Sequence, residues 1–441
     1  MPAVKPISRD EFARRRRQLM KAMGRDSIAI LPAAPVRVRN NDVEYAFRQD
    51  SDFQYLTGFR EPESVSVFVP GREQGEYVLF VRDRDPVRET WDGRRAGPEG
   101  AVSDFGADCA FPIADIDEIL PGLMENRAKV FYTVGADRDF DQRVVGWVNG
   151  LRASARHGRH PPHEIVALEH VLHDMRLYKS RAEIELMRES ARIAARAHVR
   201  AMRFCRPGLH EYQVMAEILH EFMRSRADIS YQPIVGGGEN GCILHYTENS
   251  AVLNDGELLL IDAGCEYEYY ASDITRTFPI NGRFTPEQRA LYEVVLEANL
   301  AAIAAVKPGH HWNQPHEAAV HALTAGMVRL GLLKGKVAAL VKAEAYRDFY
   351  MHRTGHWLGM DVHDVGDYKV GDVWRVLEPG MVLTIEPGLY IPPRCRSVPK
   401  RFRGLGIRIE DDVLVTRDGR SVLTADVPKQ ADELEALMAV A

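Results

Sequence analysis

The stretch NDGELLLIDAGCEYEYYASDITRTF, Asn254–Phe278, predicts a pair of antiparallel strands that carries two acidic side chains. An Asn-Asp-Gly turn signal precedes a short apolar run of buried-strand length, which ends at Asp262. A second, more polar strand, Tyr269–Thr277, carries Asp273. If the chain folds back at Tyr267–Glu268, Asp262 and Asp273 pair directly and their Cβ atoms lie about 5 Å apart.

Two carboxylates this close in a partly buried sheet cannot both stay ionised without a cation between them. One interpretation is therefore a metal site. The other is a shared proton or a solvent-facing sheet edge. The two aspartates alone leave both interpretations open.

Length and composition limit the class of protein. A chain of 441 residues is too long for one hydrophobic core, so we expect two or three domains. The net charge of -6 does not indicate a nucleic-acid-binding surface, and no apolar window has the length of a membrane span. The five cysteines are scattered and form no C-x-x-C pair, which favours reduced thiols and a cytoplasmic location.

The polar, Pro- and Gly-rich segment Arg156–His163 marks the start of a domain boundary. We expect a small α/β domain over residues 1–175 and a catalytic domain over residues 176–441. A capping box, Ser180–Glu183, opens a long helix on which His198 is expected to be a core or surface histidine. The pattern predicts two similar halves, each with long helices followed by a hairpin, over roughly residues 180–280 and 285–415. The fold class is therefore α+β, with a duplicated layout in the second domain.

Further chemistry-bearing residues follow the last long helix of the second half. His352, His356 and His363 lie in a glycine-broken, non-helical context, which indicates a functional site. Glu386 ends an apolar strand just before a Pro-Gly turn, where an acid is also common as a simple edge charge. In the last strand, Glu410 shares a face with the preceding arginine, so if that face is buried the carboxylate needs a partner or a metal.

Together, Asp262, Asp273, Glu386 and Glu410 carry four negative charges, which matches two divalent cations. Oxygen-rich ligation with one imidazole favours manganese, cobalt or iron over a thiolate-type zinc site. We expect two divalent ions, manganese first, with cobalt, iron or zinc as alternatives. Two such ions, roughly 3.5 Å apart, would polarise a carbonyl and activate a bridging water for hydrolysis.

At this point the chain resembles the pita-bread metallopeptidases, and among them the bacterial Xaa-Pro aminopeptidases (aminopeptidase P). The resemblance covers essentially the whole chain. It is carried by an ordered set of motifs: DAG at Asp262–Gly264, SDITRT at Ser272–Thr277, HRTGHWLG at His352–Gly359, VHD at Val362–Asp364, EPG at Glu386–Gly388, IRIEDD at Ile407–Asp412, RQDSDF at Arg48–Phe53 and WDGRR at Trp91–Arg95.

The resemblance implies a role for each site residue. It implies that Asp262 binds one metal and that Asp273 and Glu410 bridge the two. It places His356 and Glu386 on the second metal, with Glu386 also as general base. The residues implied to contact, shape or buttress the substrate site are His245, His352, His363, Arg408, Tyr390, Trp91, Asp42 and an arginine near Arg375.

The implied activity is hydrolysis of the bond between the first residue of a peptide and a proline at position two, by a bridging hydroxide. Proline has no N–H and a fixed φ, so a shaped pocket can select it. A homo-oligomer, dimer or tetramer, is also implied. The chain departs from the family pattern at Arg353-Thr354 and Val373-Trp374, which bears on subsite preference.

Three alternatives remain. A prolidase would use the same ligands but cut only Xaa-Pro dipeptides. A methionine aminopeptidase usually lacks a large N-terminal domain. A non-catalytic peptide-binding protein of this fold would have lost ligands, whereas this chain has all five, Asp262, Asp273, His356, Glu386 and Glu410.

Overall fold

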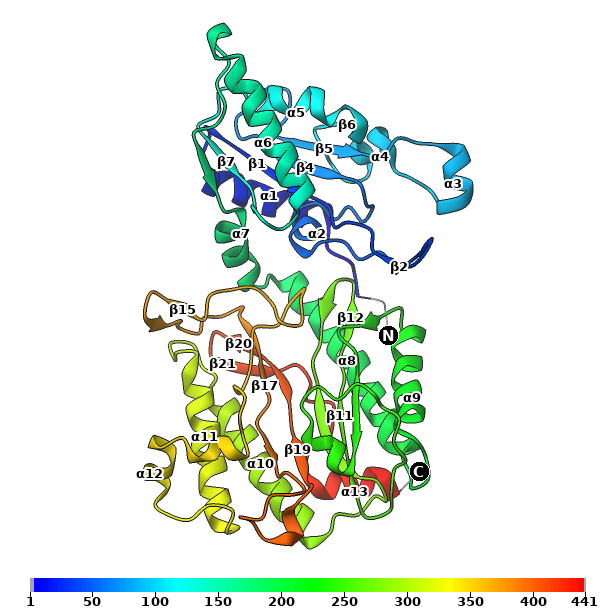
Figure 1. Ribbon diagram of the computed structural model, residues 1–441, viewed down its shortest axis with the longest axis vertical. Helices are drawn as coiled ribbons and strands as arrows, with labels where there is room; N and C mark the ends of the chain where they lie inside the picture. The colour runs from blue at the N-terminus through cyan, green and yellow to red at the C-terminus, as the bar shows by residue number, and fades with distance from the viewer. Residues whose placement is uncertain (1–3, 440–441) are drawn as a thin grey trace. The chain divides into compact units, whose positions relative to one another are not determined.

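The computed structural model describes residues 4–439, which fall into two compact units (Figure 1). The N-terminal unit is Ile7–Arg176, and the C-terminal unit begins at Leu177 and also takes in the residues just before Ile7. Both units combine helices with strands, so the predicted α+β class is confirmed. Among the described helices, none has both the length and the apolar character that crossing a membrane requires.

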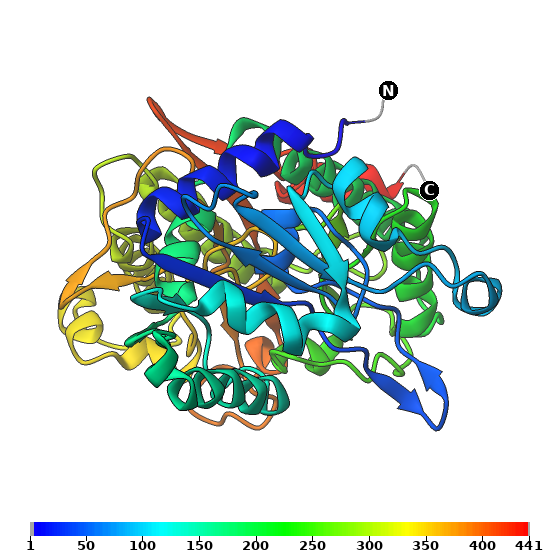
Figure 2. The ribbon, with the colours of Figure 1, turned by 90° about the horizontal axis from the view of Figure 1, so that it is seen from above.

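The N-terminal unit is built on one mixed sheet with the strand order β6-β5-β4-β1-β7-β8 (Figure 2). Its elements are α1 (Arg9–Met23), β1 (Ser27–Pro32), β2 (Val38–Asn40), β3 (Val43–Glu44), α2 (Ser51–Thr57), β4 (Val65–Phe68), β5 (Tyr77–Val81), α3 (Pro86–Asp92), α4 (Gly97–Ser103), β6 (Cys109–Pro112), α5 (Ile116–Met124), β7 (Lys129–Phe131), α6 (Arg138–Ala153), β8 (Glu164–Val166) and α7 (Leu168–Leu177). The side chains of β1 are buried on both faces of the sheet up to Leu31, and apolar side chains of α5 and α6 cover one of these faces. A strand that is buried on both faces has a nearly continuous run of apolar residues in its sequence.

The C-terminal unit contains the remaining elements. They are α8 (Arg181–Phe204), α9 (Glu211–Arg224), β9 (Asp228–Ile229), β10 (Ile234–Gly237), β11 (Leu258–Asp262), β12 (Cys265–Tyr267), β13 (Tyr270–Ala271), β14 (Thr275–Pro279), α10 (Pro286–Ala305), α11 (Asn313–Arg329), α12 (Val337–Lys342), β15 (Lys369–Val370), β16 (Val373–Trp374), β17 (Val382–Ile385), β18 (Gly388–Tyr390), β19 (Gly406–Arg408), β20 (Asp411–Thr416), β21 (Gly419–Val422) and α13 (Ala431–Ala439). The capping box predicted at Ser180 is present and begins α8.

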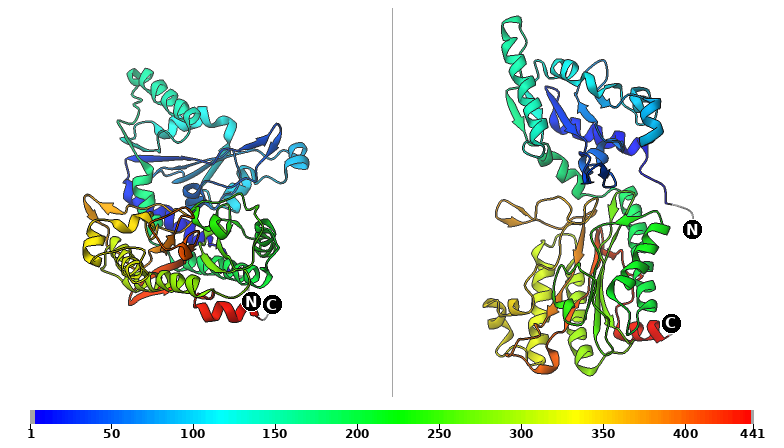
Figure 3. Two further views of the ribbon diagram at one scale, coloured as in Figure 1. Left: turned by 60° about the horizontal axis from the view of Figure 1, so that its bottom comes forward. Right: turned by 45° about the vertical axis from the view of Figure 1, so that its right-hand side comes forward.

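The C-terminal unit repeats one arrangement twice. In the first half α8 and α9 accompany the sheet β10-β11-β14, and in the second half α10 and α11 accompany the sheet β17-β20-β21. Figure 3 shows the two helix pairs on opposite sides of the strands. One continuous hydrophobic core joins apolar side chains of both halves. The strands between the helix layers therefore bring the ends of β11, β17 and β19 close together.

The predicted direct pairing of Asp262 with Asp273 is wrong. Asp262 pairs with Thr275, because the chain turns at Glu268 and Tyr269, both with positive φ, one residue later than expected. The later turn shifts the register by two residues. A shift of two keeps every side chain on its face. The two aspartates therefore still face the same side, diagonally offset instead of opposite.

Gly264 explains why this hairpin is so tight. A Cβ atom on Gly264 would lie only 1.7 Å from the carbonyl oxygen of Ser272, so no other residue fits without moving the backbone. The two strand segments therefore approach closely just where the hairpin carries Asp262 and Asp273.

Candidate active site

A pocket of about 490 Å³ lies in the C-terminal unit and contains all the predicted metal ligands. Its lining includes Tyr231, Gln232, Ile234, Leu244, His245, Thr247, Asp262, Asp273, His352, Arg353, Gly355, His356, Val362, His363, Glu386, Arg408 and Glu410. The predicted metal ligands among them come from the end of β11, the segment before β14, the loop between α12 and β15, and the residues just after β17 and β19. Five carboxylate and imidazole groups that are far apart in sequence thus converge on one cavity.

Three of these side chains already have the geometry of a cation site. Ligand atoms of Asp273, His356 and Glu410 all lie within 4.8 Å of one another. The Nε2 atom of His356 is 3.4 Å from Asp273 Oδ2 and 3.8 Å from Glu386 Oε1. Its Nδ1 atom donates to the carbonyl oxygen of Trp357 at 2.9 Å, which leaves Nε2 as the free ligand nitrogen. The residues present therefore fit a divalent metal with oxygen and imidazole ligands.

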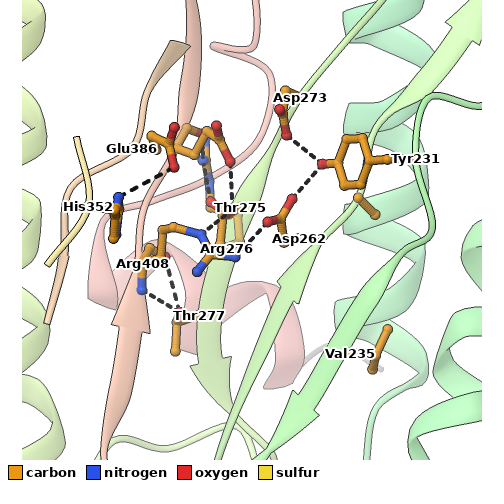
Figure 4. Close-up of polar contacts among 12 residues, drawn as sticks. Tyr231, Val235, Asp262, Asp273, Thr275, Arg276, Thr277, His352, Glu386 and Arg408 are labelled. Atoms are coloured by element: carbon orange, nitrogen blue, oxygen red, sulfur yellow. Dashed lines mark hydrogen bonds and ion pairs between the residues drawn. The ribbon is translucent and has the colours of Figure 1, made fainter. Parts of the chain in front are cut away.

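Asp262 is held from two sides (Figure 4). The hydroxyl of Tyr231 donates to its Oδ1 at 2.5 Å, and Nη2 of Arg408 donates to its Oδ2 at 2.5 Å. The same tyrosine hydroxyl also contacts Oδ1 of Asp273. Tyr231 therefore lies between the two aspartates and links them.

Arg408 orients several other groups in the site. Its Nε donates to Thr275 Oγ1 at 3.0 Å and its Nη1 donates to the Tyr390 hydroxyl at 3.0 Å. Thr275 in turn donates to Oε2 of Glu410 at 2.6 Å. Because Arg408 is buried, these bonds form in a low dielectric and fix the positions of the carboxylates firmly.

Burial makes this group of carboxylates electrostatically unfavourable without a cation. It raises the pKa of Glu410 well above its usual value, and the neighbouring Asp273 and Glu386 add to the rise. Burial likewise raises the pKa of Glu386 to about 7, although His356 opposes the effect. The pKa of Asp262 is also raised, mainly by burial and against the pull of Arg408. Bound cations would remove this penalty.

The histidines of the site differ in charge. Burial alone would lower the pKa of His356, but Asp273 and Glu386 outweigh it and raise that pKa to about 9. Burial and Arg408 lower the pKa of His352 to about 4, so this imidazole is neutral. Its two nitrogens contact the Arg353 carbonyl at 2.7 Å and the Tyr390 hydroxyl at 2.9 Å. His352 is therefore fixed by hydrogen bonds to the chain.

His245 and His363 lie at the exposed rim of the pocket. The ring of His363 meets the ring of His356 edge to face, with centroids 4.4 Å apart. Partial burial, and then the charge of His356, lower the pKa of His363. A neutral imidazole at this position can donate one hydrogen bond to a group that enters the pocket.

Four of the residues implied to contact or shape the substrate site do not line the pocket: Asp42, Trp91, Arg375 and Tyr390. Tyr390 is buried behind it and reaches the site only through His352 and Arg408. Asp42, between β2 and β3, and Trp91, in α3, lie in the N-terminal unit and are exposed. Their predicted contacts with substrate stay predictions.

Tyr231 and Thr275 are site residues that sequence reasoning missed. Tyr231 lies three residues before Ile234, and Ile234 pairs with Asp262 in the sheet. Thr275 is the true cross-strand partner of Asp262. Correct pairing of the strands would have found Thr275, which also lies within the SDITRT motif, whereas no local signal in the sequence marks Tyr231.

A second cavity, of about 670 Å³, lies between α8 and α9. Both of its glutamates are already paired: Arg196 Nε lies 2.9 Å from Glu221 Oε1, and Arg200 Nε lies 2.5 Å from Glu217 Oε2. The chemistry of this chain is therefore placed in the smaller pocket, where carboxylates outnumber their basic partners.

Comparison with known families agrees with this site. Residues 185–417 match metallopeptidase family M24, and residues 12–132 match the aminopeptidase P N-terminal domain. The first match contains all five predicted metal ligands and spans more than half of the chain. The second falls within the N-terminal unit.

Individual relatives match over the full length. The chain is 47% identical to the Xaa-Pro aminopeptidase of Escherichia coli, covering 99% of both sequences. The structure of Pseudomonas aeruginosa aminopeptidase PepP superposes with a TM-score of 0.98 at 61% identity, covering 99% of each chain. A zinc-substituted aminopeptidase P of Escherichia coli in complex with product has a TM-score of 0.96 at 47% identity and the same coverage. The predicted pita-bread fold is thereby confirmed, and the chain belongs to metallopeptidase family M24.

Proposed function

We propose that this metallopeptidase removes the first residue from peptides that carry proline at position two. The observation that carries the proposal is the convergence of Asp262, Asp273, His356, Glu386 and Glu410 in one pocket. The full-length similarity to Xaa-Pro aminopeptidases supports the choice of substrate. A prolidase restricted to Xaa-Pro dipeptides is the alternative, because the same ligands would serve it.

We propose that these five residues hold two divalent cations, with Asp273 and Glu410 between them. Manganese is our first choice, on the chemistry of the oxygen-rich donor set. When bound, such ions supply Lewis-acid polarisation of a carbonyl and a bridging hydroxide at neutral pH.

The remaining steps belong to side chains of this chain. Glu386, the general base that the resemblance implies, would accept a proton from the attacking water and later release it to the leaving amine. His363 or His245, at the rim, would donate a hydrogen bond to the attacked carbonyl oxygen as its charge develops. Arg408 keeps Asp262 oriented throughout, through the bond at 2.5 Å.

The test of the activity compares three peptides on manganese-loaded protein: Arg-Pro-Pro, Ala-Pro and Met-Ala-Ser. We expect release of free arginine from Arg-Pro-Pro. Turnover of Ala-Pro alone would instead identify a prolidase, and cleavage of Met-Ala-Ser a methionine aminopeptidase. Absence of all three activities with metal bound would refute the proposal.

The test of the metal site is the change Asp262→Asn, which removes one charged ligand but keeps the shape of the side chain. We expect loss of manganese binding, measured by metal analysis after gel filtration, together with loss of turnover. Asp418→Asn is the matched control, because Asp418 is exposed in the turn between β20 and β21. Retained manganese in Asp262→Asn would contradict the assignment.

We further propose a homo-oligomer, dimer or tetramer, in a reducing, cytoplasmic setting. Exposed apolar side chains of α3, with Val87 73% and Trp91 83% exposed, support a contact between copies. All five cysteines are free, which supports a reducing environment.

We also propose that residues 1–175 and 176–441 act as separate domains. Sedimentation velocity of the wild type and of Trp91→Ser tests the oligomer, with a smaller species expected for the variant.

A further inference from the structure

Arg353 brings a positive charge into the lining of the active-site pocket. Its backbone position is fixed by the next residue, Thr354, which is buried. The Oγ1 atom of Thr354 bonds to His316 Nδ1 at 2.8 Å and to the Tyr350 hydroxyl at 2.6 Å, and its carbonyl accepts the backbone N–H of Glu386 at 2.8 Å. Arg353 therefore stands at a defined place relative to the catalytic carboxylates.

The guanidinium group of Arg353 is also oriented. Its Cζ atom lies 5.2 Å from the ring centroid of Trp374, and its Nη1 donates to Asn313 Oδ1 at 3.3 Å. The amide of Asn313 donates to Glu317 Oε1 at 2.7 Å, which leaves the amide oxygen turned to the arginine. Stacking and one hydrogen bond thus hold the group in place without neutralising it.

Within residues 4–439, no carboxylate forms an ion pair with Arg353. Most of its N–H donors are free for a ligand, since only the bond to Asn313 is made. A second cation, Lys369, lies 4.5 Å from the same Trp374 ring. An oriented, unpaired guanidinium in a pocket is suited to binding a planar anion such as a carboxylate.

The charges of a peptide substrate decide which part of it meets Arg353. A protonated N-terminal amine is a cation, so the guanidinium group of Arg353 repels it. The peptide beyond the scissile bond is the part that can present an anion, either its terminal carboxylate or an acidic side chain. Charge complementarity therefore places Arg353 opposite the part of the substrate beyond the scissile bond, which leaves after cleavage and is called the leaving portion below.

We infer that Arg353 is a specificity-determining residue that binds a carboxylate on the leaving portion of the substrate. The inference rests on the proposed Xaa-Pro aminopeptidase activity and adds a preference that this activity does not require. Because Arg353 is exposed, we expect a moderate effect of about five- to tenfold on KM, with little change in kcat.

The test uses four peptides with the manganese-loaded enzyme: Ala-Pro-Ala, Ala-Pro-Ala amide, Ala-Pro-Asp amide and Ala-Pro-Asn amide. The first pair tests the terminal carboxylate and the second pair tests an acidic side chain. In the wild type we expect a lower KM for the acid member of at least one pair. Arg353→Gln should remove that difference and Arg353→Lys should keep part of it. Arg417→Gln, at an exposed position in the β20–β21 turn, is the control and should behave as the wild type.

Binding provides a second readout that is independent of turnover. The product Pro-Ala and its amide are titrated calorimetrically into wild type and Arg353→Gln, and only the wild type should prefer the acid. Equal KM values within both pairs in the wild type, or a preference that survives in Arg353→Gln, would overturn the inference. Failure of the wild type to cut any of the four peptides would instead count against the proposed function itself.

Discussion

Tyr231→Phe is the most informative single change in the site, because it removes one oxygen atom and keeps the ring. The lost hydroxyl is the group that donates to Asp262 at 2.5 Å and also contacts Asp273. A hydrogen bond to a charged group contributes about 1.5–3 kcal/mol. At about 1.4 kcal/mol per factor of ten, this corresponds to roughly 10- to 100-fold in affinity, the range known for residues that orient metal ligands.

We therefore expect manganese to bind Tyr231→Phe about 10- to 100-fold more weakly than the wild type. The apo protein should fold normally, because the phenyl ring still fills its place. Affinity is measured by titration against a competing chelator, and folding by thermal denaturation without metal. At saturating manganese, kcat/KM reports whether the two aspartates are still positioned correctly.

Tyr267→Phe is the control for this experiment. Tyr267 belongs to the same hairpin as Asp262 and Asp273 but lies at its far end, paired with Tyr270. Its variant should bind manganese as the wild type does. If Tyr231→Phe also retains wild-type affinity, Tyr231 does not orient the metal ligands, and the reasoning from its position between the two aspartates is refuted.

Three further changes test the packing around the site. Asp411→Asn leaves Arg276, 2.8 Å away and fully buried, without its ion pair, which should cost about 3–5 kcal/mol in urea unfolding at pH 7. Burial acts to raise the pKa of Asp411, but the basic groups around it outweigh this and lower the pKa, so the difference from wild type should shrink below about pH 4. Burial lowers the pKa of His198 to about 4, against about 6.5 when unfolded, so stability is complete above pH ~6.5 and falls by about 3 kcal/mol towards pH ~4. His198→Gln should lose this dependence in metal-free urea titrations, and an unchanged slope would contradict the assignment. Lys179→Met breaks a buried pair with Asp364, 2.9 Å apart, and should destabilise by about 3–5 kcal/mol. Adding Asp364→Leu should recover part of that loss in a double-mutant cycle.

The alternation of side chains along strands made much of the site predictable from the sequence. The predicted strand that carries Arg408 and Glu410 places the two side chains on one face, because they are two residues apart. Both are buried in the site, although β19 ends at Arg408 and Glu410 lies between β19 and β20. Asp262 ends an apolar run whose burial is evident from its composition, and Asp262 lies at the end of β11. Local periodicity depends only on backbone geometry, which the sequence carries directly.

The register and the contacts of the site could not be obtained in that way. The prediction that paired Asp262 with Asp273 failed because the position of the turn, at Glu268 and Tyr269, depends on left-handed backbone conformations that these residues rarely adopt. The predicted contacts of His352 with substrate did not include its bonds to Tyr390 and the Arg353 carbonyl.

The amino-acid sequence by itself therefore determined which residue types lie at the strand ends, and with them the metallopeptidase family. Only the tertiary structure decided that Tyr231 links the two aspartates and that the Arg353 guanidinium stacks on Trp374. The physical reason is the range of the interactions. Pleat and periodicity act between neighbours in sequence, whereas these contacts exist only once the packing of the two helix layers has brought distant segments together.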